Sequence, residues 1–290
     1  MNALSVRRRL GFGLGLLLFC LAPAAAGQPL VVRHPAPEGG DGDRRHQYYV
    51  ALLELALSKT EGAYELRSAP LVMRQGRALR QLRNGEDIDV VWTMTTAERE
   101  QGLRPVRVPL TKGLIGTRLL LVRAADAARF AGITEAKALC ALRAGQGHDW
   151  PDTRVLEANG YRVAGRASYE ALFRMLIQGR IDYYPRSVEE IWSEAEHYAA
   201  AGLVVEPTLV LRYPAAIYFF VAEANAALAR RIEAGLRRAL ADGSFDALFA
   251  QHFGALLARA GLEGRTRFDL ENPLLPSRTP LGQDGLWYQF

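Results

Sequence analysis

The stretch Arg83–Arg99 carries residue types well suited to binding a small polar molecule. Its order predicts a helix that ends at Asn84–Gly85, then a short buried strand over Ile88–Trp92, then a polar loop. Thr93 follows the strand directly, and Arg99 is expected on the first turn of a helix capped by Thr96. An arginine guanidinium can form two parallel, charge-assisted hydrogen bonds to a carboxylate. The stretch is equally compatible with an ordinary strand-to-helix connection that ends in a solvated arginine.

The chain has 290 residues, of which 49% are hydrophobic and 23% charged, as expected of a globular protein with room for two domains. Residues 1–26 differ from the rest. Three arginines precede the apolar run Leu10–Leu21, and three alanines end at Ala26, which together predict a cleaved secretory signal and a periplasmic protein. An uncleaved anchor is the alternative, although the run is shorter than the roughly 20 residues of a spanning helix.

Charge and cysteine content limit the possible partners of the mature chain. Removal of the signal takes away three arginines and no acid, so the formal net charge falls from +5 to +2. That small excess does not favour a nucleic-acid or membrane-surface partner. Cys140 is the cysteine that remains, so the sequence predicts no disulfide within the mature chain.

Strands and helices are predicted to alternate along the chain, as in a sheet with helices on its faces. A first β/α unit ends near a buried strand over 119–122. A second unit begins with a strand over 139–143, a glycine-rich loop over 145–150 and a helix over 151–159. Long amphipathic helices are predicted over 225–241 and 244–260. Two such units, with the chain crossing back near residue 213, indicate two lobes around a cleft.

The order of these signals resembles the family 3 extracellular solute-binding proteins, the amino-acid receptors of bacterial ABC importers. Thr96-Ala97-Glu98-Arg99 matches the Thr-x-x-Arg element of that family, and 118–123 is similar to its hinge strand. Gly179-Arg180-Ile181-Asp182 matches its Gly-x-x-Asp element, and 218–221 is similar to the return into the first lobe. The resemblance spans roughly residues 30–254 and marks the chain as a divergent member.

The resemblance implies a two-lobed α/β fold of type II, with two mixed sheets flanked by helices and a ligand cleft between the lobes. The implied organisation is a signal at 1–26, lobe one over 27–121, lobe two over 122–212, a return to lobe one over 213–260 and a tail over 261–290. For the tail, the sequence leaves open a position across a lobe, a contact with a partner, or a frayed end.

Carried over position by position, the family pattern makes Arg99 the anchor of the ligand's carboxylate. Trp92 and Thr93 stand where family members contact the ligand at the strand end. Gly147, His148 and Trp150 belong to the lobe-two loop that also receives the carboxylate, through backbone N–H groups at a helix start. The alternative for that loop is a tight turn in which the residue at 149, an aspartate, caps the helix.

One departure from the family pattern concerns the ligand's charge. Amino-acid receptors of the family carry an aspartate for the ligand's ammonium at the position of Ser187, next to Arg186. A serine cannot pair with an ammonium and a nearby arginine repels one, so we expect an anionic ligand that is not a standard amino acid. Arg186 pointing to solvent is the alternative.

The sequence therefore predicts a monomeric, non-enzymatic binding protein that serves ABC-type uptake through a membrane permease. A binding protein that reports to a membrane sensor is one alternative. A dehydratase-like enzyme on the same scaffold is another, with Glu98, His148 and Asp149 as its candidate acid–base residues. The histidines lack partners at metal-ligand spacing, so we expect no metal and no cofactor.

Overall fold

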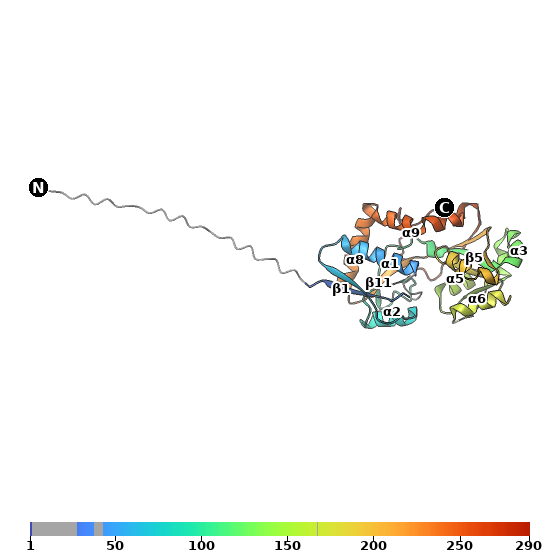
Figure 1. The fold of residues 1–290 in the computed structure, drawn as a ribbon, viewed down its shortest axis with the longest axis horizontal. Coiled ribbons are helices and arrows are strands. Elements are labelled where there is room, and N and C mark those ends of the chain that lie inside the picture. The colour runs from blue at the N-terminus through green and yellow to red at the C-terminus, as the bar shows by residue number, and fades with distance from the viewer. Residues whose placement is uncertain (2–27, 38–42, 167) are drawn as a thin grey trace.

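The computed structural model describes residues 1, 28–37, 43–166 and 168–290. It shows an α/β protein with two lobes side by side, each built on sheets that helices cover (Figure 1). The two-lobed fold class predicted from the sequence is confirmed. The expected signal, 1–26, lies outside the described residues apart from Met1. Within the described part of the chain, no helix is both long enough and apolar enough to cross a membrane.

Lobe one contains two short sheets. β1 (Leu30–His34) runs parallel to β2 (Tyr64–Ser68), whereas β11 (Ile217–Ala222) lies antiparallel between β3 (Val91–Met94) and β4 (Leu103–Val106). Two backbone N–H groups just before β3 donate to a carbonyl of β1, so the two sheets are joined there.

The helices of lobe one begin and end where local chemistry favours it. They are α1 (Arg44–Ser58), α2 (Gln75–Asn84), α8 (Ala226–Ala241) and α9 (Ser244–Ala260). The side chain of Asp43 caps α1 by accepting two N–H groups of its first turn. Gly85 ends α2 at φ +72°, a left-handed conformation that glycine adopts without strain, as predicted.

Lobe two is built on one mixed sheet. Its strands are β5 (Thr117–Arg123), β6 (Arg143–Gly147), β7 (Arg162–Arg166), β8 (Tyr183–Ser187), β9 (Leu203–Val205), β10 (Leu209–Arg212) and β12 (Thr266–Asp269). They lie in the order β12-β10-β5-β8-β6-β7, with β9 also paired to β5. β6 runs parallel to β7 and β8, and β5 runs antiparallel to its three neighbours.

The start of lobe two differs from the sequence prediction. The helices of this lobe are α3 (Ala127–Ala131), α4 (Ala136–Cys140), α5 (Pro151–Ala158), α6 (Tyr169–Ile177) and α7 (Ile191–His197). The predicted strand over 139–143 is wrong, because Leu139 and Cys140 form the end of α4, whose alanines, lysine and leucine favour helix. The strand lies later, at β6, and takes in Gly145, whose missing side chain leaves room for Ile181.

The C-terminal tail contacts both lobes. β12 extends the lobe-two sheet by pairing with β10. Further on, Asn272 donates to the carbonyl of Pro214 at 2.8 Å, and the carbonyl of Leu274 accepts the N–H of Ala97 in lobe one at 3.0 Å. Of the three positions left open by the sequence, the structure therefore shows the one across the lobes. The division of lobe one from lobe two near residues 121 and 213 stays a prediction.

Candidate functional site

Arg99 lies at the edge of lobe one, just beyond the end of β3. Its Nη1 donates to the hydroxyl of Thr93 (2.8 Å) and to the carbonyl of Met94 (2.9 Å), and its Nη2 donates to the amide oxygen of Gln75 (2.6 Å). The hydroxyl of Thr96 accepts the backbone N–H of Arg99 at 3.0 Å and so holds the turn. The helix expected after Thr96 is wrong, because residues 97–102 form turns that lead directly into β4. Both the side chain and the backbone of this arginine are fixed before any ligand arrives.

The acceptors around the Arg99 guanidinium are neutral, and no carboxylate among the described residues forms an ion pair with it. Burial lowers the pKa of Arg99, whereas the more distant carboxylates of Asp152, Asp149 and Glu98 act in the opposite direction. Asp149 and Asp152 belong to lobe two, so Arg99 faces the interface between the lobes. A fixed guanidinium without a bonded carboxylate is well placed to bind the carboxylate of a ligand.

Trp92 lies in an aromatic cluster with residues of β1 and α1. Its ring stacks on Tyr49 with centroids 5.3 Å apart, and it lies 5.2 Å from His46 and 6.1 Å from His34. Burial lowers the pKa of His34, and burial together with His34 lowers that of His46. Both rings are therefore neutral at pH 7, and the cluster is an uncharged aromatic surface. Sequence reasoning placed Trp92 in the site but missed these partners, which only the packing of α1 brings to it.

Gly147, Trp150 and Arg186 come together in lobe two. The Trp150 ring lies where a side chain on residue 147 would stand, and its centroid is 5.3 Å from Cζ of Arg186. The hydroxyl of Thr153 donates to the carbonyl of Gly147 at 2.6 Å, which ties the first turn of α5 to the end of β6. Three of the residues proposed from the sequence thus form one group.

His148 stands apart from that group. Its side chain is 57% exposed and lies 3.7 Å from the carboxylate of Asp149, itself 70% exposed. The N-cap of α5 is Trp150 without a side-chain hydrogen bond, so Asp149 does not cap this helix as the alternative interpretation required.

Arg186 is buried and already paired. Its Nε and Nη2 each donate to a carboxylate oxygen of Glu194 at 2.7 Å, and Nη2 also lies 3.1 Å from Glu190. The side chain is 2% exposed, so the alternative in which it points to solvent is excluded. Ser187 is fully buried, and its hydroxyl has no hydrogen-bond partner among the described residues. Because two carboxylates neutralise Arg186, the charge of this arginine no longer argues by itself for an anionic ligand.

A second buried arginine, Arg118 at the start of β5, was missed by sequence reasoning. Its Nε donates to the hydroxyl oxygen of Tyr213 at 2.9 Å, and its Nη2 and the Tyr213 hydroxyl both bond to one oxygen of Asp152. Burial raises the pKa of Tyr213 well above its ordinary value, so the phenol stays protonated. The group links the start of β5 and the residue after β10 to the first turn of α5.

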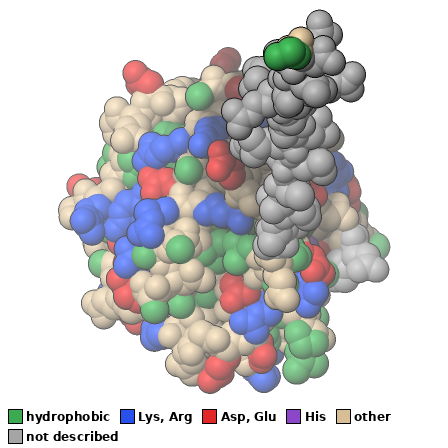
Figure 2. Space-filling model, turned by 90° about the vertical axis from the view of Figure 1, so that its left-hand side faces the viewer, with side chains coloured by type: hydrophobic (Ala, Val, Ile, Leu, Met, Phe, Trp, Pro, Cys, Tyr) green, Lys and Arg blue, Asp and Glu red, His purple; other side chains and the backbone are tan. Residues whose placement is uncertain are grey.

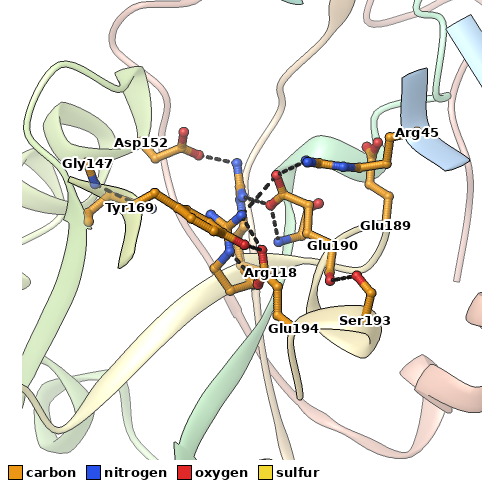
Figure 3. A network of polar contacts seen from close by, with 12 residues as sticks. Arg45, Arg118, Gly147, Asp152, Tyr169, Glu189, Glu190, Ser193 and Glu194 are labelled. Carbon is orange, nitrogen blue, oxygen red and sulfur yellow. Dashed lines mark hydrogen bonds and ion pairs between the residues drawn. The ribbon is translucent and has the colours of Figure 1, made fainter. Parts of the chain in front are cut away.

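Glu189 and Glu190 bring lobe two into contact with α1 of lobe one (Figure 3). Glu190 accepts a hydrogen bond from Arg45 at 2.7 Å, and the hydroxyl of Tyr49 donates to Glu189 at 3.2 Å. Burial favours the neutral form of Glu190, but Arg186, Arg45 and Arg118 outweigh it and lower its pKa to about 2. Two successive acids directly after a strand were the signal in the sequence for this contact.

The pKa of Glu189 is raised, whereas that of Glu190 is lowered. We therefore expect Glu189→Gln to stabilise the protein more at pH 8 than at pH 5. Burial, and then the charge of Glu190, raise the pKa of Glu189 from 4.5 to about 7. The folded protein therefore holds a proton that the unfolded chain has released. This contribution to stability is fully present below pH 4.5 and is lost as the pH rises through about 7. Urea unfolding of parent and variant at both pH values measures the effect, and an equal difference at the two would contradict it.

Two surface hollows lie away from these residues. One, of about 430 Å³, is bordered by Arg104, Arg107, Arg237 and Arg278 on lobe one. Figure 2 shows basic side chains gathered on the end of the molecule that carries β1 and α8. The other, of about 970 Å³, runs between α9 and the end of the tail. Three of the four arginines at the first hollow already bind carboxylates, and the fourth, Arg278, is exposed. At the second hollow, Lys112 binds Asp246 at 2.6 Å.

Among the described residues, histidine, cysteine and acidic side chains do not gather in groups of three that could hold a metal ion. The expectation of no metal and no cofactor stays a prediction.

Known proteins resemble this chain in structure, but the sequence comparisons give no match. No protein-family model and no curated protein matches the chain. An ancestral arginine-binding protein bound to arginine has a TM-score of 0.57 at 17% identity, over 77% of this chain and 98% of its own. A histidine kinase sensor domain with similarity to periplasmic binding proteins has a TM-score of 0.54 at 15% identity, over 79% and 97%. The substrate-binding protein of an amino acid ABC transporter has a TM-score of 0.54 at 14% identity, over 77% and 99%. At these identities the likeness establishes the fold, which is the two-lobed fold of periplasmic binding proteins.

Proposed function

We propose that the chain is a periplasmic solute-binding protein whose lobes close over a small polar ligand that carries a carboxylate. The observation that carries this proposal is Arg99, fixed by neutral acceptors, without a bonded carboxylate, and facing the interface between the lobes. Hinged closure of two lobes around a ligand is a general mode of action for this fold. The aromatic cluster around Trp92 supplies an apolar wall of the kind that ligand sites use.

The ligand we propose is not a standard α-amino acid. Ser187 cannot pair with an ammonium, and the neighbouring Glu190 is engaged by three arginines. Glu189 is close to half-protonated at pH 7, because its pKa is about 7, which makes it a weak partner for a cation. A ligand with an acid group and no ammonium fits these surroundings best.

The structural neighbours support two uses of such a site, since one belongs to an amino acid ABC transporter and another to a histidine kinase. We propose ABC-type uptake as the role, with delivery to a membrane permease. A report to a membrane sensor is the second candidate, which the kinase sensor domain favours. The acid–base residues that an enzyme would need are 57 to 80% exposed, so the proposal contains no catalytic step.

Arg99→Gln is expected to weaken binding of the native ligand by about 10- to 100-fold, because charge-assisted hydrogen bonds are worth about 1.5–3 kcal/mol. Native mass spectrometry of the gently purified protein would give the mass of the bound molecule, and calorimetry would give the affinity of parent and variant. Arg80→Gln is the matched control, since Arg80 is an exposed arginine on α2 of the same lobe. Equal affinity of parent and Arg99→Gln would refute the assigned role of Arg99.

A further inference from the structure

Two side chains of α1 reach from lobe one to lobe two. Nη1 of Arg45 lies 2.7 Å from Oε1 of Glu190, and the hydroxyl of Tyr49 lies 3.2 Å from Oε2 of Glu189. Positions 45 and 49 are four apart, so both side chains leave the same face of the helix. The cap by Asp43 fixes the first turn from which Arg45 starts. One helix of lobe one thus binds two successive residues of lobe two through its side chains.

Contacts within lobe two hold the carboxylate of Glu190 in place without any contact from lobe one. Within lobe two, Glu190 lies 3.1 Å from Nη2 of Arg186 and 3.4 Å from Nη1 of Arg118, and it accepts the backbone N–H of Ser187 at 3.2 Å. Its side chain is 11% exposed. The carboxylate therefore stays in place whether or not Arg45 is bound to it.

The side chain of Arg45 on lobe one can separate from Glu190. The side chain of Arg45 is 47% exposed, and among the described residues Glu190 is its one carboxylate partner. Release of Arg45 exposes the arginine to water and leaves Glu190 with two arginines, so neither charge becomes isolated in the interior. An ion pair of this kind can open and close as the lobes move.

We propose that Arg45 and Tyr49 are positioning residues that draw the lobes together in the absence of a ligand, through Glu190 and Glu189. This inference rests on the proposed function, in that it assigns a role to the lobe interface of the same binding protein. These contacts then supply part of the free energy that favours the closed state, and the ligand supplies the rest. Removal of the two contacts raises the open population and weakens ligand binding by the factor by which the closed population falls.

Other contacts between the lobes differ in kind. Glu98 and Arg154 lie 3.6 Å apart with side chains 80% and 63% exposed, so water and salt screen this pair. Arg259 of α9 binds Glu196 at 2.6 Å and stacks 4.3 Å from Trp192, which joins α9 to α7. Arg259→Gln therefore serves as a comparison variant, because it removes a different contact between the lobes.

The test measures the distance between the lobes with no ligand present. Helices α2 and α6 lie on different lobes, along the lower edge of the molecule in Figure 1. Spin labels are placed at Arg80→Cys on α2 and Arg174→Cys on α6. Both positions are exposed, and Cys20 and Cys140 are replaced by serine so that only the introduced cysteines carry labels. Unfolding in urea and refolding removes any copurified solute, and pulsed electron spin resonance then gives the distance distribution.

The parent is expected to show a short, narrow distribution, and Arg45→Gln with Tyr49→Phe is expected to raise the long-distance population at least fivefold. Arg44→Gln is the matched control, since this exposed neighbour on α1 has the same charge and should leave the distribution unchanged. A broad distribution in the parent would overturn the proposal. So would an unchanged distribution in the double variant, or opening by Arg259→Gln alone. Since no ligand is added, these outcomes are independent of whether Arg99 binds a carboxylate.

Discussion

Arg186→Met is expected to lower the free energy of unfolding by about 3–5 kcal/mol, the usual loss when one partner of a buried ion pair is removed. The guanidinium is 2% exposed and makes two 2.7 Å hydrogen bonds to Glu194, whose side chain is 6% exposed. Without it, the one side-chain donor left to Glu194 among the described residues is the hydroxyl of Tyr169, at 2.6 Å. Methionine restores the apolar volume beside Trp150 but not the charge, so a carboxylate is left buried and unpaired.

Urea unfolding at pH 7, followed by circular dichroism, measures this loss. Arg237→Met is the matched control, because Arg237 forms a comparable 2.7 Å ion pair with Glu233 on the surface of α8, with side chains 56% and 39% exposed. Exposed pairs on a helix contribute about 0.3–0.5 kcal/mol. Equal losses in the two variants would mean that burial does not set the strength of the Arg186 pair.

Gly235→Ala is expected to destabilise the protein by about 3 kcal/mol, at the upper end of what an overpacked core position costs. At this residue α8 packs directly against α1, and an added Cβ would overlap the backbone carbonyl of Ala56. A backbone atom cannot rotate out of the way as a flexible side chain can. The two helices would have to separate, and the buried contacts between them would be lost.

Gly254→Ala provides a control of opposite sign. Gly254 lies inside α9 with no atom within 4 Å of the position that a Cβ would take. Alanine there reduces the conformational entropy of the unfolded chain without a clash, which stabilises proteins by about 0.4–1 kcal/mol. Thermal and urea unfolding of the two variants should therefore move in opposite directions. A loss of stability in both would show that α9 is packed more tightly than the structure indicates.

The positioning role of α1 affects how the ligand site is understood. The sequence points to the absent aspartate at Ser187, and the structure adds what surrounds that position. Glu190 accepts a hydrogen bond from the backbone N–H of Ser187 and forms ion pairs with three arginines, one of them from the other lobe. The polar group opposite α1 is thus already supplied by the chain, whereas Arg99 forms no ion pair with a carboxylate among the described residues.

The sequence alone was sufficient for features set by local chemistry. The helix over 244–260 was predicted with the limits that the structure shows, because Gly243 and Gly261 adopt left-handed conformations at its two ends. The end of α2 at Gly85 and the strand that leads to Thr93 follow from turn chemistry and from the preference of branched apolar residues for strands. Such features depend on neighbours within a few residues, which the sequence shows directly.

Only the tertiary structure decided which residues share the interface between the lobes. Arg45 and Glu190 are 145 positions apart, and Arg118 and Tyr213 are 95 apart, so no periodicity connects them. Their pairing depends on how α1 packs on lobe one and on the order of the strands in lobe two. The direction in which Arg186 points was undetermined for the same reason, since Glu194 pairs with it only when β8 and α7 pack together. Local preferences determine the elements, whereas burial and long-range packing determine which charges meet and which neutral acceptors hold Arg99.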